Sequence, residues 1–326
     1  MKFAIFHGNE RWILRGLAID IEKSLLKQGI EVSRYEVDLR NPGKIPEADW
    51  FLFVQQGQLD IILRAWKYRK DLVKKSICIF THFNANNCNF ELLNKIKIVS
   101  HMSSHQMAIS IGNGLTKANS RLMPLGVDLT RHYPLKQDYV SRKLKEKYPE
   151  IKCTLKRSYI GFCTRFTRKI TYTKRKNYES LFKVVNSLVN LNKNVLIIGD
   201  GWQDVDILNR NSNLIILNPP YKDYNLFYNL MKLFVSVTSY DGGPIPLLES
   251  MACGVPSIIT NSGFAPDIIE HKKNGYLFQP FEDEQNILKG IEYMDNQNFI
   301  RSHLREAAAK YSFDEYAMNL IREVRN

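Results

Sequence analysis

The sequence lacks every common cysteine or histidine signature of a metal site: it has no CxxC pair, no HExxH motif and no spaced histidine cluster. Its five cysteines are far apart, and an odd, scattered set is typical of a reducing cytosol rather than of a disulfide framework. The aspartates of "DVD", Asp204 and Asp206, are interpreted as part of a solvated loop. We therefore expect a cytoplasmic protein without a structural metal.

Long apolar runs are also absent. No stretch reaches the ~18–20 apolar residues that a transmembrane helix needs, and the N-terminal "MKFAIFHGNERW" turns polar too early for a secretory signal. The 17 phenylalanines and 16 tyrosines argue against disorder, which is poor in aromatic residues. A chain of 326 residues is long enough for roughly two domains, each with its own core.

Acidic residues are outnumbered by basic ones: 33 Asp and Glu against 46 Lys and Arg give a formal net charge of +13, and the pI is about 9.4. Such a surplus favours polyanionic ligands, namely nucleic acid, anionic lipid or phosphorylated compounds. It is concentrated in "RAWKYRKDLVKK", residues 64–75. That segment is either a solvated helix face or a basic amphipathic helix that places Trp66 on anionic lipid headgroups.

Short apolar runs alternate with amphipathic segments along most of the chain. Runs such as "KFAIFH", "SICIFTHF" and "KNVLIIGDG" lack the alternating polarity of half-exposed strands. They predict parallel sheets covered on both faces. The charged, non-periodic residues 136–157 are expected to be a connection between domains or a surface excursion. The sequence therefore predicts two doubly wound α/β domains, with loops such as "CTRFTRK" and "SYDGGP" lining one cleft at the strand ends.

The stretch "DGGPIPLLESMACGVPSIITNSG", residues 241–263, has the pattern of a ligand site. Asp241 ends the apolar run "SVTSY", and Gly242 and Gly243 permit a tight turn. The following "IPLLESMAC" has helical spacing, which places Glu249 about one turn into a helix. A helix N-terminus attracts phosphate, and carboxylates accept hydrogen bonds from hydroxyls. The pattern indicates a ligand that carries phosphate and sugar, although Asp241 alone could simply be an N-cap.

This stretch resembles the signature of the group 1 retaining glycosyltransferases, in which an acid, seven residues and a glutamate precede a helix of this composition. Other segments resemble the same family: "SRLMPLGVDLTRHYP", "SYIGFCTRF" with "KRKNYESL", "NSGFAPDIIEHKKNGYLFQP" and the C-terminal "YSFDEYAMNLIREV". Together they cover most of residues 98–326, whereas the first hundred residues match only in pattern.

The resemblance implies the GT-B fold, in which two Rossmann-like doubly wound domains face each other across an interdomain cleft. Residues 1–135 would form the acceptor-side domain, residues 136–310 the donor-binding domain, and a helix at about 311–326 would pack back on the first. The donor would be a UDP- or GDP-sugar, used without a metal or other cofactor. The acceptor would be a glycan or a lipid-linked molecule in surface polysaccharide or glycoconjugate synthesis, with peripheral contact to the inner face of the cell membrane.

The same resemblance assigns roles to the donor-binding residues. Glu249 would hold the ribose hydroxyls, and Asp241 would contact the transferred sugar. The amides of Gly242 and Gly243 would approach the sugar and diphosphate. Asp241 departs from the usual glutamate, which shortens its reach by one methylene and favours an altered sugar preference. Pro244 stands where many members have glycine. Because proline has no backbone N–H, it removes one hydrogen-bond donor from the turn that would bind the phosphates.

Four basic candidates and two residues of the N-terminal domain complete the predicted site. Arg165 would neutralise the diphosphate together with a lysine, for which Lys176 is favoured and Lys174 and Lys169 are rivals. His82 follows a predicted strand where the family often has a histidine near the sugar, and a satisfied loop histidine is the alternative. Gly16 lies where the family's glycine loop meets its helix, and a steric role alone would also explain it.

Other classes of protein stay open at this point. A nicotinamide-dependent oxidoreductase needs G-x-G-x-x-G after the first strand, and "HGNERWILRG" lacks it. A basic nucleic-acid-binding protein would explain the charge, but no helix-turn-helix, RNP or zinc-finger pattern supports it, so no nucleic-acid partner is expected. A catalytically inactive GT-B partner protein, and a GT-B phosphorylase or epimerase, are the remaining alternatives.

Overall fold

The chain folds into two compact units in a computed structural model. The structure describes residues 1–8, 13–38, 43–81, 88–151, 156–202, 205, 208 and 212–326, except the side chains of Ile13 and Thr171. Unit 1 comprises Met1–Gly126 and Tyr311–Asn326, and unit 2 comprises Val127–Lys310. Each unit contains a six-stranded sheet.

Unit 1 is a parallel sheet in the order β2-β1-β3-β4-β5-β6. Its elements are β1 (Lys2–Gly8), α1 (Ile13–Lys27), β2 (Glu31–Val37), β3 (Trp50–Phe53), α2 (Gln56–Ala65), α3 (Lys70–Lys74), β4 (Ser76–Phe80), α4 (Phe90–Leu93), β5 (Ile98–His101), α5 (Ser104–Gly112), the 3-10 turn η2 (Lys117–Asn119), β6 (Ser120–Leu122) and α14 (Phe313–Arg325). The central strand β4 is buried throughout its length, so its apolar run contacts helices on both faces, as the sequence predicts.

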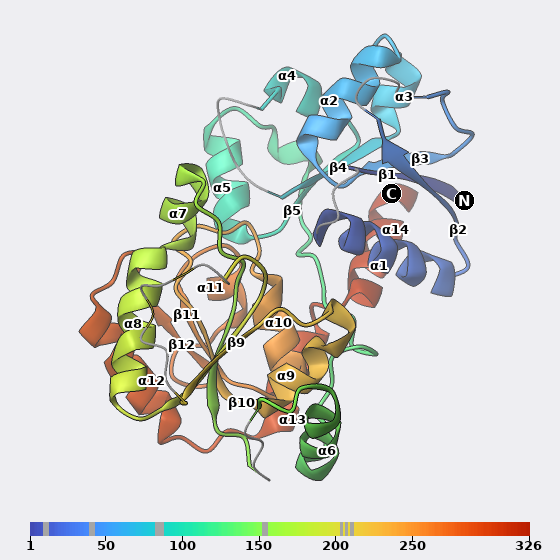
Figure 1. Ribbon diagram of the computed structural model, residues 1–326. Helices are drawn as coiled ribbons and strands as arrows, with labels where there is room; N and C mark the ends of the chain where they lie inside the picture. Colours follow the sequence, from blue (N-terminus) through green and yellow to red (C-terminus); the bar gives the residue numbers. More distant parts are fainter. Residues whose placement is uncertain are drawn as a thin grey trace. The chain divides into compact units, whose positions relative to one another are not determined.

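The C-terminal helix α14 belongs to unit 1, where it lies beside α1 (Figure 1). The Ser24 hydroxyl donates to Asp314 at 2.7 Å, and the hydroxyls of Ser100 and Tyr316 lie 3.3 Å apart. The backbone at Gly126 lies so close to the residue before α14 that a β-carbon on Gly126 would be 2.1 Å from the carbonyl carbon of Ser312. The tail of the chain is therefore a packed part of this unit.

Residues 64–75 do not form the single amphipathic helix with an exposed Trp66 that was one of the two interpretations of this segment. Helix α2 ends at Ala65, and Lys67 and Tyr68 have positive φ values of 55° and 47°, which break the helix before α3 begins. Trp66 is only 5% exposed and packs edge-on against Phe6 and Phe51 in the core. The basic residues of this segment surround a buried tryptophan, so Trp66 is not placed to contact a membrane.

Unit 2 is a second parallel sheet, in the order β12-β11-β10-β7-β8-β9. Its elements are α6 (Gln137–Lys147), β7 (Tyr159–Cys163), α7 (Ile170–Lys176), α8 (Tyr178–Asn190), β8 (Asn194–Ile198), β9 (Leu214–Leu217), the 3-10 turn η3 (Tyr221–Asp223), α9 (Tyr224–Leu230), β10 (Met231–Ser236), α10 (Ile245–Ala252), β11 (Ser257–Thr260), α11 (Ala265–Ile268), β12 (Gly275–Phe278), α12 (Glu284–Asp295) and α13 (Arg301–Ala309).

The sheet of unit 2 has a hydrophobic core on each face. One core packs α8 and α12 against β7, β8 and β10, through residues such as Leu181, Ile291 and Leu233. The other packs α6 and α9 against the opposite face, through Val140 and Phe227. Burial on both faces explains why these strands are continuously apolar in the sequence.

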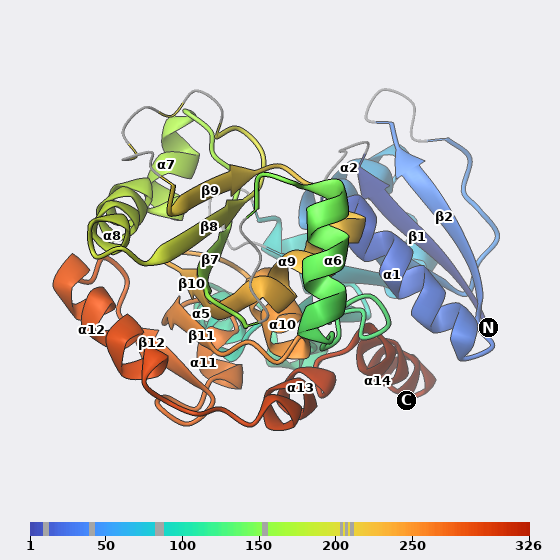
Figure 2. The same ribbon diagram turned by 60° about the horizontal axis from the view of Figure 1, so that its bottom comes forward.

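The described part of residues 136–157 belongs to unit 2 rather than forming a connection between the two units. The unit boundary lies at Gly126–Val127 rather than at residue 135, because the amides of Tyr133 and Leu135 donate to Asn225 and Asn229 at 3.1 and 2.8 Å. The charged stretch after it contains helix α6, which lies against α9 (Figure 2).

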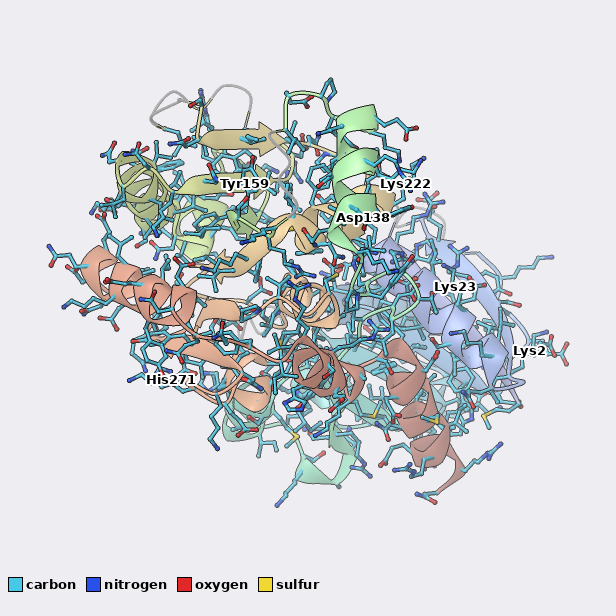
Figure 3. All side chains as sticks on the ribbon, turned by 90° about the horizontal axis from the view of Figure 1, so that it is seen from below. Lys2, Lys23, Asp138, Tyr159, Lys222 and His271 are labelled. Atoms are coloured by element: carbon cyan, nitrogen blue, oxygen red, sulfur yellow. The ribbon has the colours of Figure 1, made fainter. Side chains whose placement is uncertain are left out.

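Helix α6 is fixed to unit 2 through one apolar face and through its C-terminal end. Val140 and Leu144 enter the core, while Lys147 and Tyr148 donate to Asp223 at 2.8 and 2.9 Å. Figure 3 shows Lys222, the neighbour of Asp223 on η3, beside this helix. This helix was missed in the sequence because its apolar face is narrow and most of its other residues are charged.

Candidate active site

The carboxyl ends of β7, β8 and β10 bring the predicted site loops of unit 2 together. The amide of Phe166 donates to the carbonyl of Asp200 at 2.8 Å, which joins the loop after β7 to the loop after β8. Gly199 has a φ of 143°, and a β-carbon there would lie 2.2 Å from the carbonyl oxygen of Thr164. The indole of Trp202 donates to the same carbonyl at 2.7 Å. The two loops are therefore held in close contact, as expected for parallel strands.

Asp241 follows β10 and forms an ion pair with Lys176. The Lys176 Nζ lies 3.2 Å from Asp241 Oδ2, and an Arg175 nitrogen lies 4.0 Å from the same oxygen. The backbone amide of Gly243 donates to Asp241 Oδ1 at 3.3 Å. The carboxylate is mostly buried, and it joins the Gly242–Gly243 turn to the end of α7.

The end of α7 is positioned by Ser239. Its backbone amide and hydroxyl both donate to the carbonyl of Arg175 at 3.0 Å, and the hydroxyl also contacts the carbonyl of Lys174 at 3.0 Å. These bonds satisfy carbonyls that a helix end leaves without partners. Asn177 then takes the left-handed conformation, with φ 50° and ψ 53°, and α8 begins. The turn places Lys176, rather than the exposed side chains of Lys169 and Lys174, beside Asp241.

Glu249 lies in α10 and is only 3% exposed. The hydroxyl of Tyr228 donates to its Oε2 at 2.6 Å, and the hydroxyl of Tyr221 donates to its Oε1. The Nε2 of His132 lies 3.5 Å from the same Oε1. A buried carboxylate is costly unless it is hydrogen-bonded, and these groups meet that need.

The two tyrosines remain protonated donors. Tyr221 is partly exposed, but burial of its hydroxyl end against Glu249 raises its pKa, and the Glu249 carboxylate raises that pKa further. The pKa of Tyr228 is raised by burial, by Cys163 and by Glu249. Neither phenol ionises at neutral pH, so each keeps its hydrogen bond to Glu249.

Arg165 lies on the loop after β7 with its side chain 43% exposed. Its Nε is 3.9 Å from a carboxylate oxygen of Asp200, a long and solvated ion pair. Its backbone carbonyl accepts a hydrogen bond from Tyr178 at 2.6 Å. The backbone of Arg165 is therefore fixed. Its guanidinium lies at the carboxyl end of the parallel strands, where it can contact an anion.

The remaining predicted residues have less defined surroundings. Pro244 is the N-cap residue of α10, directly after the Gly242–Gly243 turn. Gly16 lies within α1, and among the described residues no atom lies within 4 Å of where its β-carbon would be, so the steric role is not required. His82 lies outside the described residues.

The sequence did not point to the partners of the two predicted acids. No site role was assigned to Tyr221 or Tyr228 from the sequence, and His132 was within "TRHYP". Arg175 was one of several adjacent basic residues. The available signal was the tyrosine-rich run "YKDYNLFY", whose spacing alone does not show which acid it contacts.

In the part of the chain that the structure describes, no group of three or more His, Cys, Asp or Glu side chains gathers as a metal site would require. None of the described helices combines the length and the apolar character needed to cross a bilayer.

The comparisons with known proteins agree with this architecture. Residues 170–311 match the family model described as glycosyl transferases group 1. Spore coat protein SA of Bacillus subtilis is 24% identical over 227 residues, which are 63% of this chain and 58% of that protein. The chain spans about half the length of the curated relatives it matches first.

Two solved structures resemble the whole chain. Sucrose-phosphate synthase from Thermosynechococcus elongatus has a TM-score of 0.74 at 13% identity, covering 99% of this chain and 98% of its own. Anabaena HepE, solved in complex with UDP-glucose, has a TM-score of 0.75 at 16% identity, covering 100% of this chain and 99% of its own. The predicted fold class is confirmed: the two parallel-sheet units are those of the GT-B fold.

Proposed function

Residues 170–311 belong to the group 1 glycosyltransferase family, and from this premise we propose that the protein transfers a sugar from a nucleotide-diphosphate sugar with retention of anomeric configuration. The observation that carries the proposal is the Asp241–Lys176 pair beside the N-terminus of α10, the helix that also holds Glu249. One carboxylate with a cation, a helix N-terminus and a second carboxylate suit a ligand made of sugar, diphosphate and ribose in that order.

The donor's two ends are assigned to the two acids. Asp241 accepts hydrogen bonds from hydroxyls of the transferred sugar, and Glu249 accepts them from the ribose. Support for the second role comes from the environment of Glu249, whose buried carboxylate is oriented by Tyr228. A fixed carboxylate loses little entropy on binding a pair of hydroxyls.

The diphosphate is assigned to fixed positive charge. Arg165 and Lys176 supply cations, and the Gly242–Gly243 turn that precedes α10 supplies backbone hydrogen-bond donors. Charge grows on the diphosphate as the glycosidic bond breaks, so groups already in place there lower the barrier. With two such cations the reaction proceeds without a metal ion in this proposal.

The donor and acceptor are proposed by class. HepE binds UDP-glucose, which supports a UDP-sugar, and a GDP-sugar is the second choice. The acceptor is a glycan or a lipid-linked molecule, used in surface polysaccharide or glycoconjugate synthesis at the cytoplasmic face of the membrane. Because Trp66 is buried, peripheral membrane contact is supported only by the net charge of +13.

A thermal-shift panel tests the proposal. UDP, GDP, ADP and their glucose and galactose derivatives are each added to the protein, with inorganic phosphate as the control. At 100 times its dissociation constant, the correct nucleotide should add about 2.7 kcal/mol to the free energy of unfolding. Phosphate alone should add far less, because it lacks the ribose that Glu249 would hold. If no nucleotide in the panel raises the Tm above the phosphate control, the proposed function is wrong.

A further inference from the structure

The groups that hold Glu249 differ sharply in their exposure. Tyr228 and His132 are each 0% exposed, so both are fixed within unit 2. Tyr221, which donates to Glu249 Oε1, is 45% exposed. Its hydroxyl end reaches the buried carboxylate while much of the ring faces water. Among these three neighbours, Tyr221 alone borders solvent.

Tyr221 lies on a short surface turn rather than in the core. It begins η3, which directly follows Pro219 and Pro220. The Arg131 guanidinium lies 5.1 Å from the ring centroid, and the Tyr224 ring packs edge-on at 5.2 Å. These contacts hold the ring over Glu249 without burying it, so the side chain can turn into water without leaving a cavity.

We propose that the Tyr221 hydroxyl occupies the place of a ribose hydroxyl in the unliganded protein and is displaced from Glu249 Oε1 when the nucleotide binds. This inference rests on the proposed function of Glu249. It assigns Tyr221 as a residue that sets nucleotide affinity by competing for one oxygen, while Tyr228 keeps the other oxygen in position.

The cost of displacement explains why Tyr221, rather than Tyr228, is exchangeable. A phenol that moves into water exchanges one hydrogen bond for another, whereas a buried phenol that loses its acceptor pays the full desolvation penalty. The ligand hydroxyl replaces the lost bond on Glu249. The carboxylate therefore stays hydrogen-bonded in both states. At Oε1, the ribose hydroxyl contributes to the binding free energy only the difference between its own hydrogen bond and the one that Tyr221 made.

Isothermal titration with UDP, GDP and ADP tests the inference on the full chain. Tyr221→Phe removes the competing hydroxyl and should bind the cognate nucleotide about ten-fold more tightly than the wild-type protein, because a hydrogen bond to a charged group is lost from the unliganded state only. The matched variant Tyr228→Phe should bind more weakly than wild type, because Glu249 loses its fixed partner. Tyr221→Leu also lacks the hydroxyl and provides a second variant with the same expected direction.

The 2′,3′-dideoxy form of the same nucleotide identifies the group that competes. Its affinity should be equal for wild type and Tyr221→Phe, because it has no hydroxyl to place on Glu249. The inference is overturned if neither Tyr221 variant tightens binding of the ribonucleotide, or if the gain is equally large for the dideoxy form. If wild-type protein binds none of the three nucleotides, the proposed function fails and the inference fails with it.

Discussion

Replacing Arg165 with alanine should lower kcat by about 10²–10³-fold, the usual cost of removing one group that stabilises charge in a transition state. The donor KM should change much less, because the charge that Arg165 meets grows as the diphosphate leaves. The measurement is steady-state kinetics with the nucleotide sugar that gives the largest thermal shift.

We expect the Arg165→Ala variant to fold like the wild-type protein. Tyr178 contacts the backbone carbonyl of Arg165, so that hydrogen bond survives the substitution. Lys183 is the matched control: its side chain is 56% exposed on α8 and pairs with Glu179 at 2.8 Å. Lys183→Ala should keep the wild-type kcat. If kcat is the same in both variants and in the wild-type protein, Arg165 has no role in the reaction.

Replacing Glu249 with alanine should raise the Kd of the nucleotide about 100-fold and alter kcat little. Hydrogen bonds to a charged group contribute about 1.5–3 kcal/mol each, and the ribose is held equally in the ground and transition states. The Kd is measured by isothermal titration, and kcat at saturating donor.

Stability has to be separated from binding in this case. Removing Glu249 leaves the Tyr228 hydroxyl buried without its acceptor, at a cost of about 1–3 kcal/mol. Glu249→Gln retains an acceptor for Tyr228 and loses the charge, so its Tm should lie closer to that of wild type. If both variants lose stability and keep the wild-type Kd, Glu249 is a structural residue only.

The sequence was most informative where function depends on local pattern. The helical spacing of "IPLLESMAC" correctly placed Glu249 one turn into a helix, whereas Asp241 lies beyond β10 but not directly at its end, because the strand ends at Ser236. Lys176 was favoured over its neighbours, and it is the lysine that contacts Asp241. Their roles toward a donor stay predictions.

The sequence failed where contacts are distant or where charge masks burial. Tyr228 is 21 residues from Glu249 along the chain, and spacing within one segment does not report such a contact. Trp66 stands among basic residues, yet the reversal at Lys67 and Tyr68 turns it into the core. Helix α6 was missed because its apolar face is narrow, with Val140 and Leu144 between charged residues.

We propose that this chain cleaves a nucleotide sugar with retention and without a metal. The most direct measurement is proton NMR of the first anomer released from the cognate nucleotide sugar, recorded with and without EDTA. We expect the α-anomer from an α-linked donor, formed at the same rate in both samples. Release of the β-anomer first, or a loss of turnover in EDTA that Mn²⁺ restores, would contradict the account.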